Sequence, residues 1–298
     1  MAPTAKPKPL IIGDTRIDRI VETVGGFFPA REFFPSLTDE FLEEHREWLE
    51  PRFIDSNGNV ILCFQSYLVR TPRHTILVDS CVGNDKPRPM RPMFNMFKLD
   101  AWEKGLAALE VGLADIDFVM CTHLHVDHVG WNTKLENGRW VPTFPNARYI
   151  FSQTELDFWT KRETDDPELC PWITDSVLPV VAANRHQCVA SDHEFDGALR
   201  LTPTPGHTID HFSVEVGGRQ PDAIIGGDMV HSPIQVLFPD TGMFSDYSSE
   251  QAAQTRRALF DRICDTPTRL CTAHFHEPSI IRITGRNEAG YDWEYDAE

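Results

Sequence analysis

The sequence lacks several features, and each absence argues against a class of protein. No apolar run reaches the roughly 18 residues that span a bilayer, so we expect no membrane partner. None of the seven cysteines belongs to a C-x-x-C pair, and this odd count is typical of a reduced protein. The first nine residues contain no apolar stretch, so we expect no secretory signal there. Together these absences predict a cytoplasmic protein.

Basic residues are scarce as well. The 298 residues include 28 Lys and Arg against 45 Asp and Glu, which gives a formal net charge of −17. A chain this acidic repels phosphate backbones, so we expect no nucleic-acid partner. The hydrophobic share of 41% and the charged share of 24% are those of an ordinary globular protein. No low-complexity linker divides the chain, which favours a single domain over 1–298.

Short apolar runs alternate with a few amphipathic stretches along the chain. We expect helices at 36–50, from 100 to 113, at 152–159 and from 248 to 263. We expect strands at 60–70, 74–79, 116–121, 148–151, 177–181, 187–190, 198–202, 211–216, 223–227 and 269–272. This order predicts packed sheets with helices outside them. Residues 1–55 are expected to form an N-terminal extension, of which 1–9 are flexible.

Two stretches are expected to be surface loops with unusual composition. Residues 26–35 contain four phenylalanines, and residues 85–98 contain three prolines with several Met and Phe side chains. Such side chains on loops suit the wall of an apolar pocket or a subunit interface, which leaves a homodimer open. Packing beneath the surface as part of the core is an equal alternative.

Three histidines and an aspartate fall within six residues directly after an apolar run. They are His123, His125, Asp127 and His128. Crowding such side chains beside a buried strand costs desolvation energy unless something binds them. Imidazole and carboxylate groups suit zinc, iron, cobalt or manganese. Four ligands at this spacing indicate two divalent metal ions rather than one closed structural site.

Three later segments each place a polar residue at the end of an apolar run: His207, Asp228 and His274. Gly206 and Gly227 precede two of them, and glycine allows the close backbone approach that a tight metal loop needs. No cysteine takes part, although closed structural zinc sites favour cysteine. This favours an open, catalytic site over a structural site or a chance cluster.

The His-x-His-x-Asp-His block, followed by Gly-His, Gly-Asp and Ala-His, resembles the metallo-β-lactamase superfamily over about residues 60–280. The resemblance implies an α+β fold, an αββα sandwich of two mixed β-sheets flanked by helices. It implies a first metal held by His123, His125 and His207, a second held by Asp127, His128 and His274, and Asp228 bridging both. It also implies that Asp79 orients these ligands, although a simple turn residue is the alternative.

A hydroxide shared by two metal ions would attack a carbonyl carbon or a phosphorus atom, with Asp127 orienting it. His231, three residues after Asp228, occupies a position where dinuclear lactonases typically carry tyrosine, and histidine there resembles the methyl parathion hydrolase-like branch. It would donate a hydrogen bond to the substrate. Zinc is the first expectation for the metal, with iron, manganese or cobalt as alternatives.

The resulting hypothesis is a dinuclear hydrolase that opens lactones or cleaves small neutral esters. The acidic composition and the aromatic loops favour a small, neutral, partly apolar substrate. A phosphotriesterase of the methyl parathion hydrolase type is the alternative within hydrolases. A metal-dependent oxygenase or redox protein of the same fold is the alternative from another class.

Overall fold

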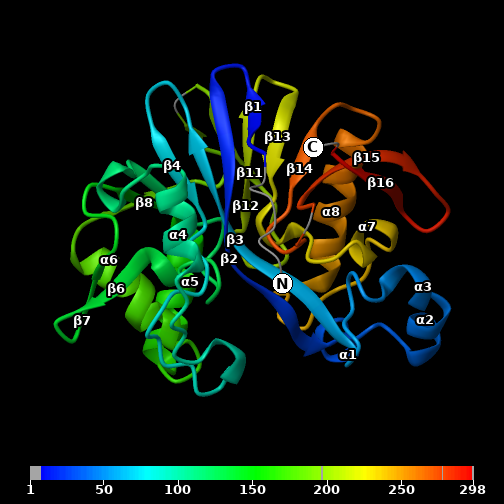
Figure 1. The fold of residues 1–298 in the computed structure, drawn as a ribbon, viewed down its shortest axis with the longest axis horizontal. Coiled ribbons are helices and arrows are strands. Elements are labelled where there is room, and N and C mark those ends of the chain that lie inside the picture. The colour runs from blue at the N-terminus through cyan, green and yellow to red at the C-terminus, as the bar shows by residue number, and fades with distance from the viewer. Residues whose placement is uncertain (1–7, 196, 277, 297–298) are drawn as a thin grey trace.

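The computed structural model describes residues 8–195, 197–276 and 278–296. The segment 1–7, most of the stretch expected to be flexible, lies outside this description. Two seven-stranded mixed sheets form the centre of the molecule, and helices cover their outer faces (Figure 1). The predicted α+β sandwich is therefore confirmed.

The first sheet has the order β1-β2-β3-β4-β5-β8-β9, and its strands come from residues 10 to 189. Its strands are β1 (Leu10–Ile12), β2 (Thr15–Pro29), β3 (Asn59–Arg70), β4 (Thr75–Val78), β5 (Phe118–Met120), β8 (Arg148–Ser152) and β9 (His186–Val189). From β4 to β9 the strands run parallel, whereas β1 to β4 pair antiparallel. A separate hairpin consists of β6 (Thr133–Glu136) and β7 (Arg139–Pro142).

The second sheet has the sequential order β10 to β16. Its strands are β10 (Glu194–Phe195), β11 (Leu199–Pro203), β12 (Phe212–Gly217), β13 (Pro221–Ile225), β14 (Arg269–Cys271), β15 (Ile280–Arg286) and β16 (Tyr291–Tyr295). Only β13 and β14 pair in parallel, and helix α8 (Ser249–Ile263) lies between them in sequence. A parallel pair needs such a crossover connection.

The remaining helices are short and lie outside the sheets. They are α1 (Ala30–Phe33), α2 (Asp39–Glu44), α3 (Arg46–Leu49), α4 (Ala101–Ala108), α5 (Gln153–Asp165), α6 (Leu178–Ala182) and α7 (Ile234–Leu237), with a π-helical turn at Ile173–Val177. Helices α4, α5 and α6 lie on one side of the sandwich, and α7 and α8 lie on the other (Figure 1). Ser152 and Ser248 cap α5 and α8, each accepting a hydrogen bond from a backbone N–H three residues on.

Alternating side chains explain why the sandwich has three apolar layers. In β13, Ala223 and Ile225 face the core between the sheets, whereas Ile224 packs against α8. In β4, Ile76 likewise faces the inner core and Leu77 faces the outer helices. Both faces of these strands are buried, so their sequences are continuous apolar runs with no polar alternation.

Several predicted elements were wrong or incomplete. The helix expected at 36–50 is broken at His45 into α2 and α3, and the His45 ring packs against Phe41 and Phe238. The strand expected at 177–181 is helical, because Pro179 sits in the first turn of α6, where its missing N–H costs nothing. Strands β1, β2, β6, β7, β10, β15 and β16 were not predicted at all.

The region expected to be an N-terminal extension contributes β1 and β2 to the first sheet. Strand β2 pairs along the whole of β3, with register shifts near Val21 and Gly26. The prediction of a loop at 26–35 is therefore wrong for residues 26–29, which form the end of β2. Helix α1 follows directly. Within the described residues, no helix has the length and apolar character needed to cross a membrane.

Candidate metal centre and adjoining cavity

The histidine-rich loop begins where β5 ends, and Asp79 fixes its first turn. Asp79 follows β4 with a positive φ of 58°. Its Oδ1 accepts a hydrogen bond of 2.8 Å from the backbone N–H of Thr122, and its Oδ2 accepts one of 2.9 Å from the Thr122 hydroxyl. The same Oδ2 lies 2.9 Å from Nδ1 of His128. The aspartate at the end of β4 thus joins both ends of the loop.

All seven residues expected to bind metal converge at one edge of the sandwich. His207 follows β11, Asp228 follows β13 and His274 follows β14, so the second sheet supplies three of them. Two groups have ligand atoms that all lie within 4.8 Å of one another. The first is His123, His125, His207 and Asp228, and the second is Asp127, His128, Asp228 and His274. These are the two sets that the resemblance to the metallo-β-lactamase superfamily implied.

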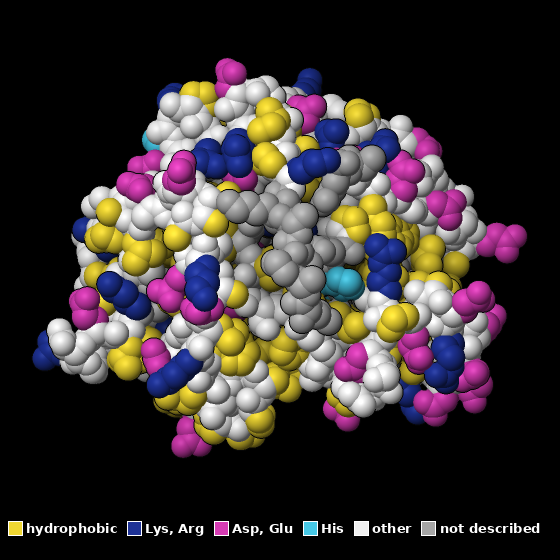
Figure 2. All heavy atoms as spheres, in the orientation of Figure 1, with side chains coloured by type: hydrophobic (Ala, Val, Ile, Leu, Met, Phe, Trp, Pro, Cys, Tyr) yellow, Lys and Arg dark blue, Asp and Glu magenta, His cyan; other side chains and the backbone are white. Residues whose placement is uncertain are grey.

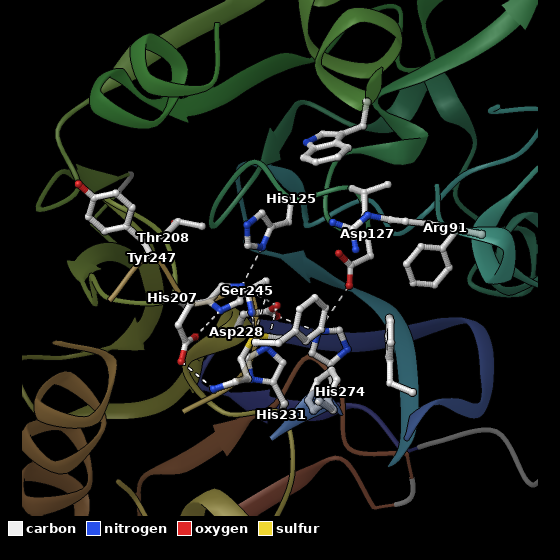
Figure 3. A pocket seen from close by; sticks show the side chains of 18 of the residues that line it. Arg91, His125, Asp127, His207, Thr208, Asp228, His231, Ser245, Tyr247 and His274 are labelled. Atoms are coloured by element: carbon white, nitrogen blue, oxygen red, sulfur yellow. Dashed lines mark hydrogen bonds and ion pairs between the residues drawn. The ribbon is translucent and has the colours of Figure 1, made fainter. Parts of the chain in front are cut away.

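Asp228 lies between the two groups and offers one oxygen to each (Figure 3). Its Oδ2 is 3.2 Å from Nε2 of His207, and its Oδ1 is 2.9 Å from Nε2 of His274. Nε2 of His128 also lies 3.0 Å from Oδ1. A buried carboxylate surrounded by imidazoles on both sides has the arrangement of a ligand shared by two cations.

The donor atoms themselves indicate that a cation belongs here. Within the described part of the chain, Nε2 of His123, Nε2 of His128 and Oδ1 of Asp228 are buried and make no hydrogen bond. Leaving such atoms unsatisfied costs about 1–3 kcal/mol each. Nitrogen and carboxylate donors aimed at a common point satisfy a divalent metal ion. The cluster therefore fits a metal site.

The opposite ring nitrogens of the histidines are held by the protein. Besides the contact of His128 with Asp79, Nδ1 of His274 lies 3.0 Å from the carbonyl oxygen of Cys63. Nδ1 of His207 lies 3.0 Å from Oδ1 of Asp246. Such contacts fix the tautomer and orientation of a metal-binding imidazole. Sequence reasoning missed Asp246, since it lies in a loop with no motif around it.

His211 holds the backbone of Asp228 in place. Its Nε2 accepts a 3.0 Å hydrogen bond from the Asp228 N–H, and its Nδ1 lies 2.8 Å from the Thr204 hydroxyl. Burial lowers the pKa of His211 to about 3, and neighbouring His207 acts in the same direction. Gly227 has a φ of 53°, and a Cβ there would lie 2.5 Å from Nε2 of His211. Only glycine fits between Asp228 and this support.

Burial and charge act in opposite directions on the histidines of the cluster. Burial holds the pKa of His123 and of His125 well below the ordinary value. Burial also opposes protonation of His207, but its contacts with Asp228 and Asp246 outweigh burial and raise its pKa to about 9. Without a cation, the cluster therefore retains a proton near Asp228. A metal ion binding there would displace that proton.

His231 lies beside this cluster, as its spacing from Asp228 implied. Its Nε2 is 3.1 Å from Oδ2 of Asp228, and its backbone N–H donates a 2.7 Å hydrogen bond to Oε1 of Gln235. Its ring stacks on that of His274 with centroids 5.2 Å apart. His231 is buried in the protein but lines the cavity described next, together with Asp228 and His274.

A cavity of about 390 Å³ opens onto the cluster (Figure 3). Aromatic side chains are prominent in its walls, and both stretches expected to be loops contribute to them: Phe28 and Phe33 from the first, Arg91 and Phe94 from the second. Phe244 packs against Phe28 and Phe33, and Trp172 lies beside Arg91, so these two rings extend the same lining. The volume and lining are those of a site for a small molecule with an apolar part.

A buried ion-pair network holds the 85–98 stretch in place. Arg88 forms two hydrogen bonds of 2.6 and 2.8 Å with the carboxylate of Asp175, which lies in the π-helical turn. Lys86 lies 3.7 Å from the same carboxylate and donates a 2.8 Å hydrogen bond to Thr133. Burial lowers the pKa of Lys86 to about 7, while Asp175 opposes that shift. The part of the cavity wall formed by residues 85–98 is therefore held by buried ion pairs to Asp175.

Comparisons with known proteins agree with this architecture. No curated protein sequence matches the chain. Among solved structures, the hydrolase AbOPH of the beta lactamase superfamily has a TM-score of 0.82 and 23% identity over 99% of both chains. AidC, a dizinc quorum-quenching lactonase solved with the product N-hexanoyl-L-homoserine, has a TM-score of 0.80 and 19% identity, covering 98% of this chain and 97% of AidC. A probable metal-dependent hydrolase from Staphylococcus aureus has a TM-score of 0.74 and 16% identity, covering 97% of this chain and all of that chain.

At these identities the solved structures establish the fold alone. The sequence itself supplies the stronger match: the profile of the metallo-beta-lactamase superfamily covers residues 65–274, from β3 to the last histidine of the cluster. That range is more than half of the chain and contains every residue of the two ligand groups. The protein belongs to the metallo-β-lactamase superfamily.

Proposed function

We propose that this protein is a dinuclear metal-dependent hydrolase that opens lactones or cleaves small carboxylic esters. The observation that carries the proposal is Asp228, whose two oxygens face two separate groups of histidines at the floor of an aromatic cavity. A structural metal site would be enclosed, whereas this one borders open space. An open position beside the ligands is the mark of a catalytic site.

Each residue of the cluster has a defined part in this proposal. His123, His125 and His207 would hold one ion, and Asp127, His128 and His274 the other, with Asp228 shared. Divalent ions bound there supply Lewis acidity and lower the pKa of water from about 15.7 toward about 7. Asp127 is the most accessible carboxylate of the cluster, with a side-chain exposure of 15%, and it faces the cavity. It would orient the attacking water and carry its proton.

The name of AidC supports both the zinc ions and the lactone substrate proposed here, because it is a dizinc lactonase. The Phe-lined walls would bind an acyl or aryl portion of the substrate. A phosphotriesterase is the second candidate. It is favoured by His231, whose imidazole borders both Asp228 and the cavity at the position expected for a contact with the leaving group.

A substrate panel with measured metal content tests the proposal. The panel contains N-hexanoyl-L-homoserine lactone, γ- and δ-lactones, 4-nitrophenyl butyrate, an aryl phosphotriester and a cephalosporin. We expect two metal ions per chain and a kcat/KM for a lactone or carboxylic ester at least about tenfold above that for the phosphotriester. The reverse order would favour the phosphotriesterase. A single iron with oxygen uptake would rule out a hydrolase.

Substitution of His231 by alanine should reduce turnover without removing metal. The ring lies beside Asp228 but its Nε2 belongs to neither ligand group, so metal content should equal that of the wild type. Loss of a hydrogen-bond donor to the substrate should lower kcat on the order of 100-fold. His231→Gln keeps a side-chain donor and should recover part of the loss. Wild-type kcat in the alanine variant would remove His231 from the mechanism.

A further inference from the structure

Arg91 places a cation in the wall of the cavity, beside the cluster of candidate metal ligands (Figure 3). It belongs to the stretch 85–98, and its side chain points into the cavity beside Asp127 (Figure 3). Its guanidinium carbon lies 5.6 Å from the centroid of the Trp172 ring. Phe94, one turn further along the chain, lines the same wall. The guanidinium group therefore lies beside the aromatic ring of Trp172.

The backbone that carries Arg91 is firmly held. The Arg91 N–H donates a 2.9 Å hydrogen bond to the carbonyl of Arg88, and Phe94 N–H donates one of 2.9 Å to the carbonyl of Arg91. Arg88 is buried and bound to Asp175 through both of its terminal nitrogens. Arg91 is thus presented to the cavity by a fixed turn rather than by a free loop, and a site for recognition needs this kind of support.

The Arg91 guanidinium lacks a protein acceptor. Within 8–195, 197–276 and 278–296, no hydrogen bond or ion pair reaches its nitrogens, and its protein contact is the Trp172 ring. Burial lowers the pKa of Arg91, and the more distant charge of Asp127 offsets this only in part. A partly buried cation without an acceptor is costly, and a ligand that supplies one removes this cost.

We propose that Arg91 binds a carboxylate that the substrate carries in addition to its scissile ester or lactone. A guanidinium group binds a carboxylate through paired, charge-assisted hydrogen bonds, and the partial burial of Arg91 reduces the competition of water for them. The inference rests on the proposed hydrolase function and narrows its substrate to acid-bearing esters. It replaces the neutral substrate expected from composition.

The net charge of −17 does not oppose this assignment, because the acidic residues are not concentrated at the cavity. Figure 2 shows acidic side chains scattered over the visible face among basic ones. Inside the cavity, the acidic groups Asp127, Asp228 and Asp246 all contact histidines of the cluster. Arg162 also lines the cavity, but its side chain is exposed and lies over Phe158. Water satisfies Arg162, whereas Arg91 is the partly buried cation of the cavity.

Paired substrates test the proposal. The mono-4-nitrophenyl esters of succinic, glutaric and adipic acid are compared with 4-nitrophenyl butyrate, using the metal-loaded wild type, Arg91→Met and Arg91→Lys. For the best acid ester, we expect a wild-type kcat/KM 10- to 100-fold above that for butyrate. Arg91→Met should abolish this preference by lowering the kcat/KM for the acid ester to that for butyrate. Arg91→Lys should retain part of it. Arg139→Met removes the same charge on exposed β7 and should keep the preference.

A binding measurement separates this inference from the proposed hydrolysis. The corresponding anilides, N-(4-nitrophenyl)glutaramic acid and N-(4-nitrophenyl)butanamide, are titrated while tryptophan fluorescence is recorded, since Trp172 adjoins Arg91. We expect the acid to bind at least about tenfold more tightly to the wild type and equally to Arg91→Met. If no ester is cleaved but this selectivity holds, the hydrolase proposal fails and the Arg91 site stands. Equal binding of the two anilides to the wild type would overturn the Arg91 site.

Discussion

Asp228→Ala is expected to lose bound metal and to reduce turnover by at least about 1000-fold. Both ligand groups depend on this one carboxylate, since Oδ2 faces His207 and Oδ1 faces His274. Without it, each group retains three ligands but loses the negative charge between them. Metal content measured by elemental analysis should fall well below that of the wild type, together with kcat.

Asp246→Asn is the matched control for this substitution. Asp246 also contacts a histidine of the cluster, Nδ1 of His207, but faces only that one ring from outside. Loss of such an outer contact typically costs 10- to 100-fold in metal affinity or activity. Unfolding curves recorded in chelator should show that both variants fold. Wild-type metal content and turnover in Asp228→Ala would refute the shared-ligand assignment.

Asp175→Asn should give the largest loss of stability among the substitutions proposed here, about 3 kcal/mol in the free energy of unfolding. The change leaves Arg88 buried without a counter-charge, and Arg88 cannot shed its proton. Lys86 can lose its proton, because burial has already lowered its pKa to about 7. The expected loss in the free energy of unfolding is therefore at the low end of the range of about 3–5 kcal/mol for broken buried ion pairs. Urea denaturation of the metal-free proteins measures the loss.

Asp240→Asn provides a control with the same geometry at the surface. Asp240 accepts two hydrogen bonds of 2.7 Å from Arg257, as Asp175 does from Arg88, but the Asp240 side chain is 72% exposed. Water screens that pair, so its loss should cost less than about 1 kcal/mol. If both substitutions lowered stability equally, burial would not be the source of the effect.

Most of the candidate site could be predicted from the sequence because its ligands occur at the ends of apolar strands. His123 to His128 follow β5 within a few residues, and His207, Asp228 and His274 each end a comparable run. A strand end fixes where its side chains lie, so order along the chain translates into position at the sheet edge. The helices capped by Ser152 and Ser248 were predicted for a similar local reason.

Residues that depend on tertiary contact were missed. Asp246 contacts His207 from 39 positions away, and its surrounding sequence resembles any surface turn. Sequence reasoning noted Arg91 only as part of a proline-rich loop. Its position in the cavity depends on the buried ion pair between Arg88 and Asp175, which lie 87 residues apart in sequence. The strand expected at 177–181 was wrong because β-branched apolar residues favour strands locally, and only packing decides for a helix.

The positions of the candidate ligands along the chain also determine when the complete site can form during synthesis. His274, the last ligand, is oriented by the carbonyl of Cys63, which precedes it by 211 residues. If two ions bind as proposed, the second has its full set of donors only after residue 274 has been synthesised. Metal capture would then be a late event that follows docking of the two sheets, and an incomplete or misassembled chain would fail to retain the ions.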